Sequence, residues 1–342
     1  MSRTLMRAEV EEIPEAAARF LDRARSEVAG AAEALRRLDP VLIATVARGS
    51  SDHAATYLKY AVEIAAEIPV ASIGPSVASI YGRRPRLAGA ACIGISQSGR
   101  SPDIVAMMQA AEAGGALTLA LTNDPASPLA ASVGHVLPLH AGPERSVAAT
   151  KTFVVSVVAG LALLAEWRGD DALRAGLERL PDAFARALGC DWTPLADRLG
   201  AAESLYVIGR GPAYAIAGET ALKFKETCGL HAESYSAAEV LHGPAAIIGS
   251  AFPVLALGAD DAALPGLLDT AGRLAGQGAE VFLAAPGMAA SATSLPIGPD
   301  VHPLLGPLVR IVSVYACVEA LARRRGRDPD APPHLNKVTE TR

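Results

Sequence analysis

The chain of 342 residues has few cysteines and no excess of positive charge. Its four cysteines lie far apart, without the short spacing of zinc and redox motifs or the density of a disulfide scaffold. We therefore expect no metal and a reducing compartment, by default the cytoplasm. The formal net charge of -5 argues against a general nucleic-acid binder, because binding to phosphate backbones depends on many clustered cations.

Long apolar runs are also missing. The composition is 51% hydrophobic with a mean hydropathy of +0.27, yet no run reaches the roughly 18 uninterrupted apolar residues of a membrane span. The first 21 residues carry several glutamates where a signal peptide would have its apolar core. We therefore expect a cytoplasmic protein with no membrane segment and no export signal.

Length and the order of the elements predict two similar domains. A buried strand at 41–46 precedes a loop at 47–52 and a helix from 53 to about 67, and the pattern starts again with a strand at 205–208. Further strands are expected at 90–95, 117–122, 253–257 and 280–284. Because strands alternate with helices, we expect an α/β fold with two tandem copies of a doubly wound parallel sheet flanked by helices.

The expected organisation along the chain has five parts. They are a helical segment at 1–34, a first sheet domain at 35–168, a helical connector at 169–198, a second sheet domain at 199–332 and a C-terminal tail at 333–342. The connector is predicted from a polar stretch that contains Pro181 and Pro194.

The loop at 96–101 is rich in serine and lies where a buried strand enters a helix. Its hydroxyl-bearing residues are Ser96, Ser98 and Ser101. Together with the free N–H groups of the helix N-terminus they can hold a phosphate, and Gly99 would let the backbone come close. The alternative is an ordinary helix cap by Ser101. A phosphate site is favoured because Ser50 and Ser51 follow the neighbouring strand and can face the same crevice.

The second copy has Ala256-Leu-Gly258 in place of the serine loop, so we expect one phosphate pocket per chain. Its helix at 215–228 places Glu219, Lys223 and Glu226 on one face. Alone, such a row is most often a solvated, salt-bridged face. The chain has only five lysines among 31 basic residues, however, and a retained lysine indicates a need for a compact, titratable amine.

Two further residues have a structural interpretation when each is taken alone. His242, in Leu241-His-Gly-Pro244, stands at a predicted helix start and is typical of a structural histidine. Lys337 lies in the terminal tail, where a lysine is usually solvated.

The motifs together resemble the sugar-isomerase (SIS) family. The matching strings are ARGSS at 47–51, SQSGRSPD at 96–103, ERSVAATKTF at 144–153, ETALKFKETCGLHAESYSAAEVLHGP at 219–244 and HLNKVTETR at 334–342. They are similar to the isomerase half of glutamine:fructose-6-phosphate aminotransferase and to stand-alone glucosamine-6-phosphate deaminases. The resemblance covers nearly the whole chain.

The resemblance implies a role for each matching residue. The phosphate would be bound by Ser51, Ser96, Gln97, Ser98 and Ser101. Val147 would line the sugar beside Ala149, which replaces a serine that contacts sugar hydroxyls in the aminotransferase. Glu226 would move a proton between C1 and C2, and Lys223 would fix charge beside it.

The resemblance also assigns the two remaining residues. His242 would open the sugar ring from the partner subunit of a homodimer, and Lys337 would close over the open-chain sugar. Opening a hemiacetal needs a group that changes charge near neutral pH, which histidine provides. No metal or organic cofactor is implied.

The implied activity is deamination of glucosamine 6-phosphate to fructose 6-phosphate, because no glutaminase domain precedes the motifs in this sequence. Three alternatives stay open. They are an isomerase or deglycase for another amino-sugar or glycated amino-acid phosphate, a synthetic subunit fed ammonia by a separate glutaminase, and a non-catalytic sugar-phosphate sensor. A sensor has no need of Glu226, His242 and Lys337 together.

Overall fold

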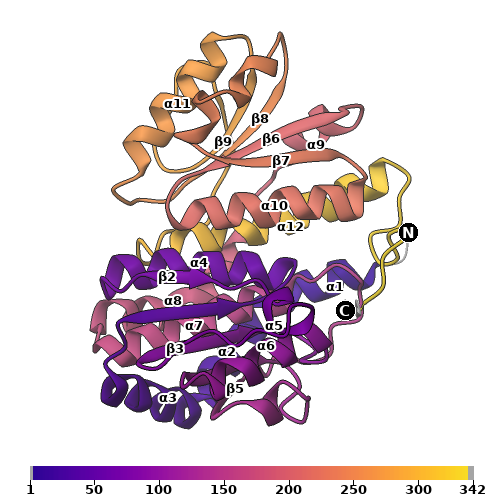
Figure 1. Cartoon of the computed structure of the whole chain (residues 1–342). Helices are drawn as coiled ribbons and strands as arrows, with labels where there is room; N and C mark the ends of the chain where they lie inside the picture. Colours follow the sequence, from indigo (N-terminus) through magenta and orange to yellow (C-terminus); the bar gives the residue numbers. More distant parts are fainter. Residues whose placement is uncertain (1–2, 338–342) are drawn as a thin grey trace. The chain divides into compact units, whose positions relative to one another are not determined.

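The computed structural model describes residues 3–337 and divides the chain into two compact units (Figure 1). The first unit contains residues 15–144 and 151–178 and continues in the tail from Asn336. The second contains the chain up to Pro14, the short segment Arg145–Thr150 and the stretch Arg179–Leu335. Each unit is built on one five-stranded sheet, so the expected α/β fold with two sheets is confirmed.

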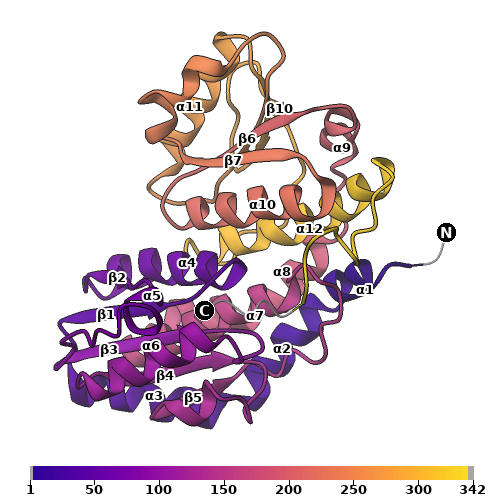
Figure 2. The same ribbon diagram turned by 45° about the vertical axis from the view of Figure 1, so that its right-hand side comes forward.

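The sheet of the first unit is parallel throughout, with the order β2-β1-β3-β4-β5, as Figure 2 shows. Its strands are β1 (Leu42–Val46), β2 (Val70–Ser72), β3 (Ala90–Ile95), β4 (Leu117–Thr122) and β5 (His135–Pro138). The helices are α2 (Ile13–Arg23), α3 (Arg25–Leu38), α4 (Ser50–Ala65), α5 (Ser76–Ser79), α6 (Pro102–Ala113) and α7 (Lys151–Arg168), with the 3-10 turn η1 (Ala130–Ser132). Two helices are divided between the units: Ile13 and Pro14 of α2 belong to the second, and helix α8 (Asp171–Ala187) begins in the first and ends in the second.

Both faces of this sheet are buried, which explains why its strands read as continuous apolar runs. Successive side chains of a strand point to opposite faces. Ala44 and Cys92 therefore pack with Met107 of α6, whereas Ile43 and Ile93 face the side of α4 and α7.

The second unit repeats this topology. Its strands are β6 (Ser204–Gly209), β7 (His231–Ser236), β8 (Pro253–Leu257), β9 (Glu280–Ala284) and β10 (Thr293–Ser294), in the parallel order β10-β9-β8-β6-β7. Its helical elements are α1 (Leu5–Glu11), α9 (Thr193–Leu199), α10 (Pro212–Cys228), η2 (Glu239–Leu241), η3 (Pro244–Ile247), α11 (Leu264–Gly276) and α12 (Gly306–Arg324). Numbered along the chain within each unit, both sheets have the order 2-1-3-4-5.

The repeat extends to the backbone of one turn. Gly49 precedes α4 with φ 55° and ψ -133°, and Gly211 precedes α10 with φ 59° and ψ -136°. This conformation is open almost only to glycine, so the strand-to-helix turn explains both residues. The expected start of the first of these helices was wrong: α4 begins at Ser50 rather than His53, and Ser50 and Ser51 lie in its first turn.

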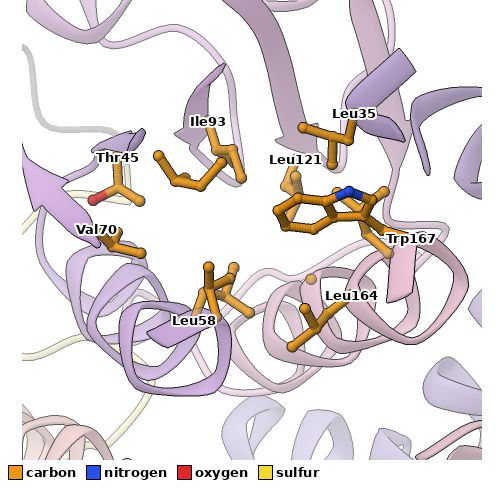
Figure 3. Close-up of a pocket in the computed structure, with 12 residues that line it drawn as sticks. Leu35, Thr45, Leu58, Val70, Ile93, Leu121, Leu164 and Trp167 are labelled. Carbon is orange, nitrogen blue, oxygen red and sulfur yellow. The ribbon is translucent and has the colours of Figure 1, made fainter. Parts of the chain in front are cut away.

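An apolar cavity lies inside the first unit, between its sheet and the helices α4 and α7 (Figure 3). The centre of a water-sized sphere can occupy about 20 Å³ of it. Leu58, Leu164 and Trp167 form part of its wall. Gly160 of α7 lies against Leu58, because a Cβ at Gly160 would be 2.2 Å from the Cδ2 of that leucine. Close packing of α4 on α7 therefore requires glycine at this position.

Among residues 3–337, no helix is long and apolar enough to span a bilayer.

We predict that Gly160→Ala lowers the free energy of unfolding by about 1–3 kcal/mol, because the added methyl group displaces Leu58. The matched control is Gly30→Ala on α3, where nothing lies within 4 Å of the added Cβ. The control should gain about 0.5–1 kcal/mol from the higher helix propensity of alanine. Denaturant unfolding of both variants measures the difference, and equal stabilisation by both would contradict the packing described here.

Candidate functional site

The serine-rich segments of the first unit lie at one edge of its sheet. In the strand order 2-1-3-4-5 the chain reverses its direction of winding between β1 and β3, which is where ligands bind in open α/β sheets. The two strands are paired directly, with Val46 opposite Gly94. The segment after β1 carries Ser50 and Ser51, and the segment after β3 is the loop 96–101. The structure therefore brings these residues to the same edge of the sheet, outside the carboxyl ends of β1 and β3, and this edge is called the serine crevice below.

The loop 96–101 is held by its own hydroxyl groups. The Oγ of Ser96 accepts a hydrogen bond from the N–H of Gly99 at 3.1 Å, and the Oγ of Ser98 accepts one from the N–H of Arg100 at 3.3 Å. The carbonyl of Gln97 accepts from the N–H of Asn123 at 3.1 Å. A hydroxyl that accepts in this way still has its proton to donate, so the loop is fixed while its O–H groups can bind an anion.

One expectation about this loop needs revision. Ser101 occupies the N-cap position of α6, with Pro102 as the first helical residue, but within the described chain its hydroxyl makes no capping bond. The ordinary cap is therefore wrong as an account of Ser101. Gly99 has φ 61°, and a Cβ there would lie 2.1 Å from the Oγ of Ser127. Packing inside the protein therefore favours glycine here, and the close approach of a phosphate to Gly99 stays a prediction.

Helix α4 contributes the other wall of the crevice. Its first-turn N–H groups, including those of Ser50 and Ser51, have no carbonyl partner within the helix and carry partial positive charge. The N–H groups of Asp52 and His53 turn back to the carbonyl of Gly49, at 2.9 and 3.3 Å. Two helix N-termini therefore meet at this edge, an arrangement suited to a phosphate group.

An ion pair that sequence reasoning missed joins the two walls. Arg48 donates from Nε and Nη2 to the Oδ2 of Asp103 at 3.0 and 2.9 Å. The Asp103 side chain is 1% exposed and that of Arg48 is 51% exposed. Burial raises the pKa of Asp52 nearby, and the positive charge of Arg48 partly offsets that rise. One signal for this pair was present in the sequence, namely the arginine inside the ARGSS string.

The second unit holds a buried group of charges on α10. Lys223 and Glu219 are fully buried, with their Nζ and Oε1 atoms 3.5 Å apart, and Lys223 also donates to the Oε2 of Glu226, whose side chain is 22% exposed. Tyr315 of α12 donates its hydroxyl to Glu219 at 2.9 Å. The solvated, salt-bridged face considered for this row is therefore wrong, because burial leaves only Glu226 accessible to a ligand. Sequence reasoning missed Tyr315.

His242 lies between two 3-10 turns of the second unit, η2 and η3, and its side chain is exposed. Its N–H donates to the carbonyl of Glu239 at 2.9 Å, so it ends a turn and does not begin an α-helix as expected. Gly243 follows with φ 136°, which sets the direction of the chain into η3.

The tail lysine is bound to a buried carboxylate of the first unit. The Nζ of Lys337 lies 3.0 Å from the Oε2 of Glu144, which is fully buried and also accepts from the N–H and hydroxyl of Thr152 at 3.0 and 2.6 Å. Sequence reasoning missed Glu144. Residues 338–342 of the expected tail lie outside the described chain.

The segment that carries the expected sugar contacts belongs to the second unit. Val147 and Ala149 are half-buried there, and the N–H of Val147 donates to the carbonyl of Asp330 at 3.2 Å. The same aspartate accepts from the N–H groups of Leu5 and Met6 of α1 with its side chain, at 2.7 Å each. This segment is therefore tied to the first helix of the chain.

The structure thus groups the expected residues by unit. Those of the first unit are Ser50, Ser51, Ser96, Gln97, Ser98, Ser101 and Lys337; those of the second are Val147, Ala149, Lys223, Glu226 and His242. Across residues 3–337, no three His, Cys, Asp or Glu side chains come together as metal ligands.

Comparison with known proteins agrees with a fold built from two copies. The model of the SIS domain matches residues 42–166 and 199–282, one segment in each copy of the fold. A crystal structure from Silicibacter pomeroyi DSS-3, described as that of a candidate phosphosugar isomerase, is 55% identical with a TM-score of 0.93, over 96% of this chain and 100% of that one. Glucosamine-6-phosphate deaminase from Thermotoga maritima, at 18% identity and a TM-score of 0.71 over 93% and 99% of the two chains, shares the fold.

Curated relatives are longer than this chain. Glutamine--fructose-6-phosphate aminotransferase [isomerizing] from Gloeobacter violaceus is 36% identical over 309 residues, which is 85% of this chain and 50% of that protein. The chain therefore spans about half the length of the curated relatives it matches. With a family model matched in both units and a solved relative matched over its whole length, the chain belongs to the SIS (sugar isomerase) family.

Proposed function

We propose that this protein converts glucosamine 6-phosphate to fructose 6-phosphate and ammonia. The observation that carries the proposal is the position of Glu226, the one accessible carboxylate of the buried group on α10 described above. Lys223, itself fully buried, holds its Oε2. A proton transfer between neighbouring carbons needs such a carboxylate, fixed in direction and still open to the substrate.

The phosphate is assigned to the crevice of the first unit. The N-termini of α4 and α6 and the serine hydroxyls offer N–H and O–H donors to a phosphomonoester. A family that acts on sugar phosphates needs such an anchor, since binding energy from a non-reacting group orients the reacting carbons.

The reaction then proceeds through steps that balance without a cofactor. His242 transfers the proton that opens the hemiacetal, giving an aldehyde at C1. Glu226 removes the proton from C2 and returns it to C1, and a proton passes from the C2 nitrogen to the C1 oxygen, which together convert the 2-amino aldose to a 2-imino ketose. Water adds to the C2 imine and ammonia leaves, producing the ketone of fructose 6-phosphate. Lys337 stabilises the negative charge that develops on the C1 oxygen and can also form a Schiff base with the ketose, whereas the buried Lys223 acts only by holding Glu226.

Deamination is favoured over synthesis because it needs only water as the second reactant. A second candidate is the same chemistry on a related amino-sugar or glycated amino-acid phosphate. Ala149 favours that candidate, since its methyl group offers no hydrogen bond where the resemblance places a serine.

We predict that the purified chain releases ammonia from glucosamine 6-phosphate and forms an equal amount of fructose 6-phosphate, with or without a chelator. A panel of aminohexose 6-phosphates and glycated amino-acid phosphates, assayed for ammonia, ranks the two candidates. Release from another compound of the panel alone would replace glucosamine 6-phosphate as the substrate.

We predict that Glu226→Gln lowers kcat by at least about 100-fold and changes the Kd for fructose 6-phosphate by less than about 3-fold, because general acid–base catalysis typically contributes 100- to 10,000-fold. Glu203→Gln, an exposed carboxylate just before β6, is the control and should keep full activity. Turnover of Glu226→Gln at the rate of the original protein would remove Glu226 as the base.

We predict that His242→Asn and Glu226→Gln, each inactive alone, regain activity when their subunits are mixed and exchanged. If His242 acts in the site of a partner subunit, each mixed dimer contains one site with both original residues. After random exchange about half of the dimers are mixed, and one of the two sites in each mixed dimer is intact. The mixture should therefore regain about a quarter of the original activity. No recovery between subunits that demonstrably exchange would place both residues in one chain's site.

A further inference from the structure

Arg48 is a half-exposed cation at the mouth of the serine crevice. It ends the segment that leads from β1 to Gly49, and Asp103 holds it from the first turn of α6. Its guanidinium therefore lies beside the helix N-terminus that begins after Ser101. The position is that of a group that can reach a ligand bound by either wall.

Asp103 uses only one edge of this guanidinium. Arginine has five N–H donors in a rigid fork, and within residues 3–337 the bonds of Arg48 are the two from Nε and Nη2 to Asp103. The second edge of the fork, with three N–H donors, remains on a side chain that is 51% exposed. That edge matches two oxygens of a phosphate, which a lysine ammonium cannot do in the same way.

The charges around the crevice require such a cation. Asp103 is almost fully buried there, and Asp52 lies in the first turn of α4, so two carboxylates flank the place assigned to an anion. Helix N-termini supply only about half a unit of positive charge each. Arg100, the next arginine along the loop, is paired with Asp124 at 3.0 Å. Arg48, in contrast, is bound to the buried carboxylate of α6 itself, so its charge is the one placed to offset the repulsion between that carboxylate and a dianion.

The second copy of the fold provides an internal comparison. Arg210 precedes Gly211 as Arg48 precedes Gly49. Its Nη1 lies over the first turn of α11, 3.4 Å from the Cβ position of Gly266, where the residues Leu264-Pro265-Gly266 include no acid. The copy with the serine loop thus has an acid in the first turn of the helix next to its arginine, namely Asp103 of α6. The copy without that loop has no acid in the first turn of α11.

We propose that Arg48 binds the phosphate of the substrate, and that Asp103 is the positioning residue that directs its free edge into the crevice. The inference rests on the phosphate placement in the proposed function. It makes Arg48 a determinant of specificity for phosphomonoesters over unphosphorylated sugars.

The test compares Arg48→Gln with Arg210→Gln, using fructose 6-phosphate as the probe in calorimetry and glucosamine 6-phosphate in kinetics. Arg48→Gln should raise Kd and KM by about 10- to 100-fold, the usual value of a charge-assisted hydrogen bond, with kcat at saturation changed by less than about 3-fold. It should also weaken the dependence of Kd on salt. Arg210→Gln should leave all of these values unchanged.

Asp103→Asn separates positioning from structure. This variant keeps the guanidinium of Arg48 but weakens the two hydrogen bonds that orient it, so Kd should rise by less than in Arg48→Gln. The double variant should bind no worse than Arg48→Gln alone. Thermal unfolding of each variant is measured in parallel. If Arg48→Gln does not fold, Arg48→Lys and the double variant, which leaves no unpaired buried charge, carry the comparison.

The outcomes distinguish this inference from the proposed function. An unchanged Kd in folded Arg48→Gln, or an equal loss in Arg210→Gln, would overturn the role of Arg48 and leave the deaminase proposal intact. Tight binding of fructose 6-phosphate without ammonia release would overturn the deaminase proposal alone. If the original protein binds neither fructose 6-phosphate nor inorganic phosphate, the placement on which both rest is wrong.

Discussion

The ammonium group of Lys223 is buried without exposed surface, and this constraint determines the geometry around it. Removing a charge from water is costly unless opposite charges and hydrogen bonds surround it, and breaking such a pair costs about 3–5 kcal/mol. Glu219 and Glu226 supply the opposite charges, and Tyr315 satisfies Glu219 in turn. Because the buried lysine must keep its partners, the partly exposed carboxylate of Glu226 is held in one orientation. A residue on the surface would sample many rotamers.

The crevice of the first unit achieves the same rigidity with backbone groups. Ser96 and Ser98 bind the amides of their own loop, and Gly99 packs against Ser127 too closely for any other residue. These contacts give the donors their positions before a ligand arrives, which reduces the cost of ordering on binding. Only the Arg48–Asp103 bond crosses from one wall to the other among the contacts described above.

Local patterns in the sequence predicted the strands and the strand-to-helix turns, because hydrophobic periodicity and turn residues are local features of a sequence. The strands at 90–95 and 117–122 were predicted with the bounds observed, and glycine marked both strand-to-helix turns. The partners that complete the sites could not be predicted in this way. Asp103 lies 55 residues from Arg48, and Glu144 lies 193 residues from Lys337. Contacts of that separation depend on the assembled fold. The start of α4 was misjudged because its first-turn serines are equally typical of loops.

The two copies of the fold have kept their backbones and diverged in their chemistry. Gly49 and Gly211 differ by a few degrees in φ and ψ, so the turn that aims a helix N-terminus at the sheet edge is the same in both. The first copy adds serines and an acid that orients its arginine. The second lacks those serines and places a lysine and two glutamates further along its helix α10, where Glu219 and Lys223 are buried and Glu226 is partly exposed. A duplicated scaffold can therefore carry a serine loop in one copy and a buried group of charges in the other, because neither set of residues disturbs the turn that both copies need.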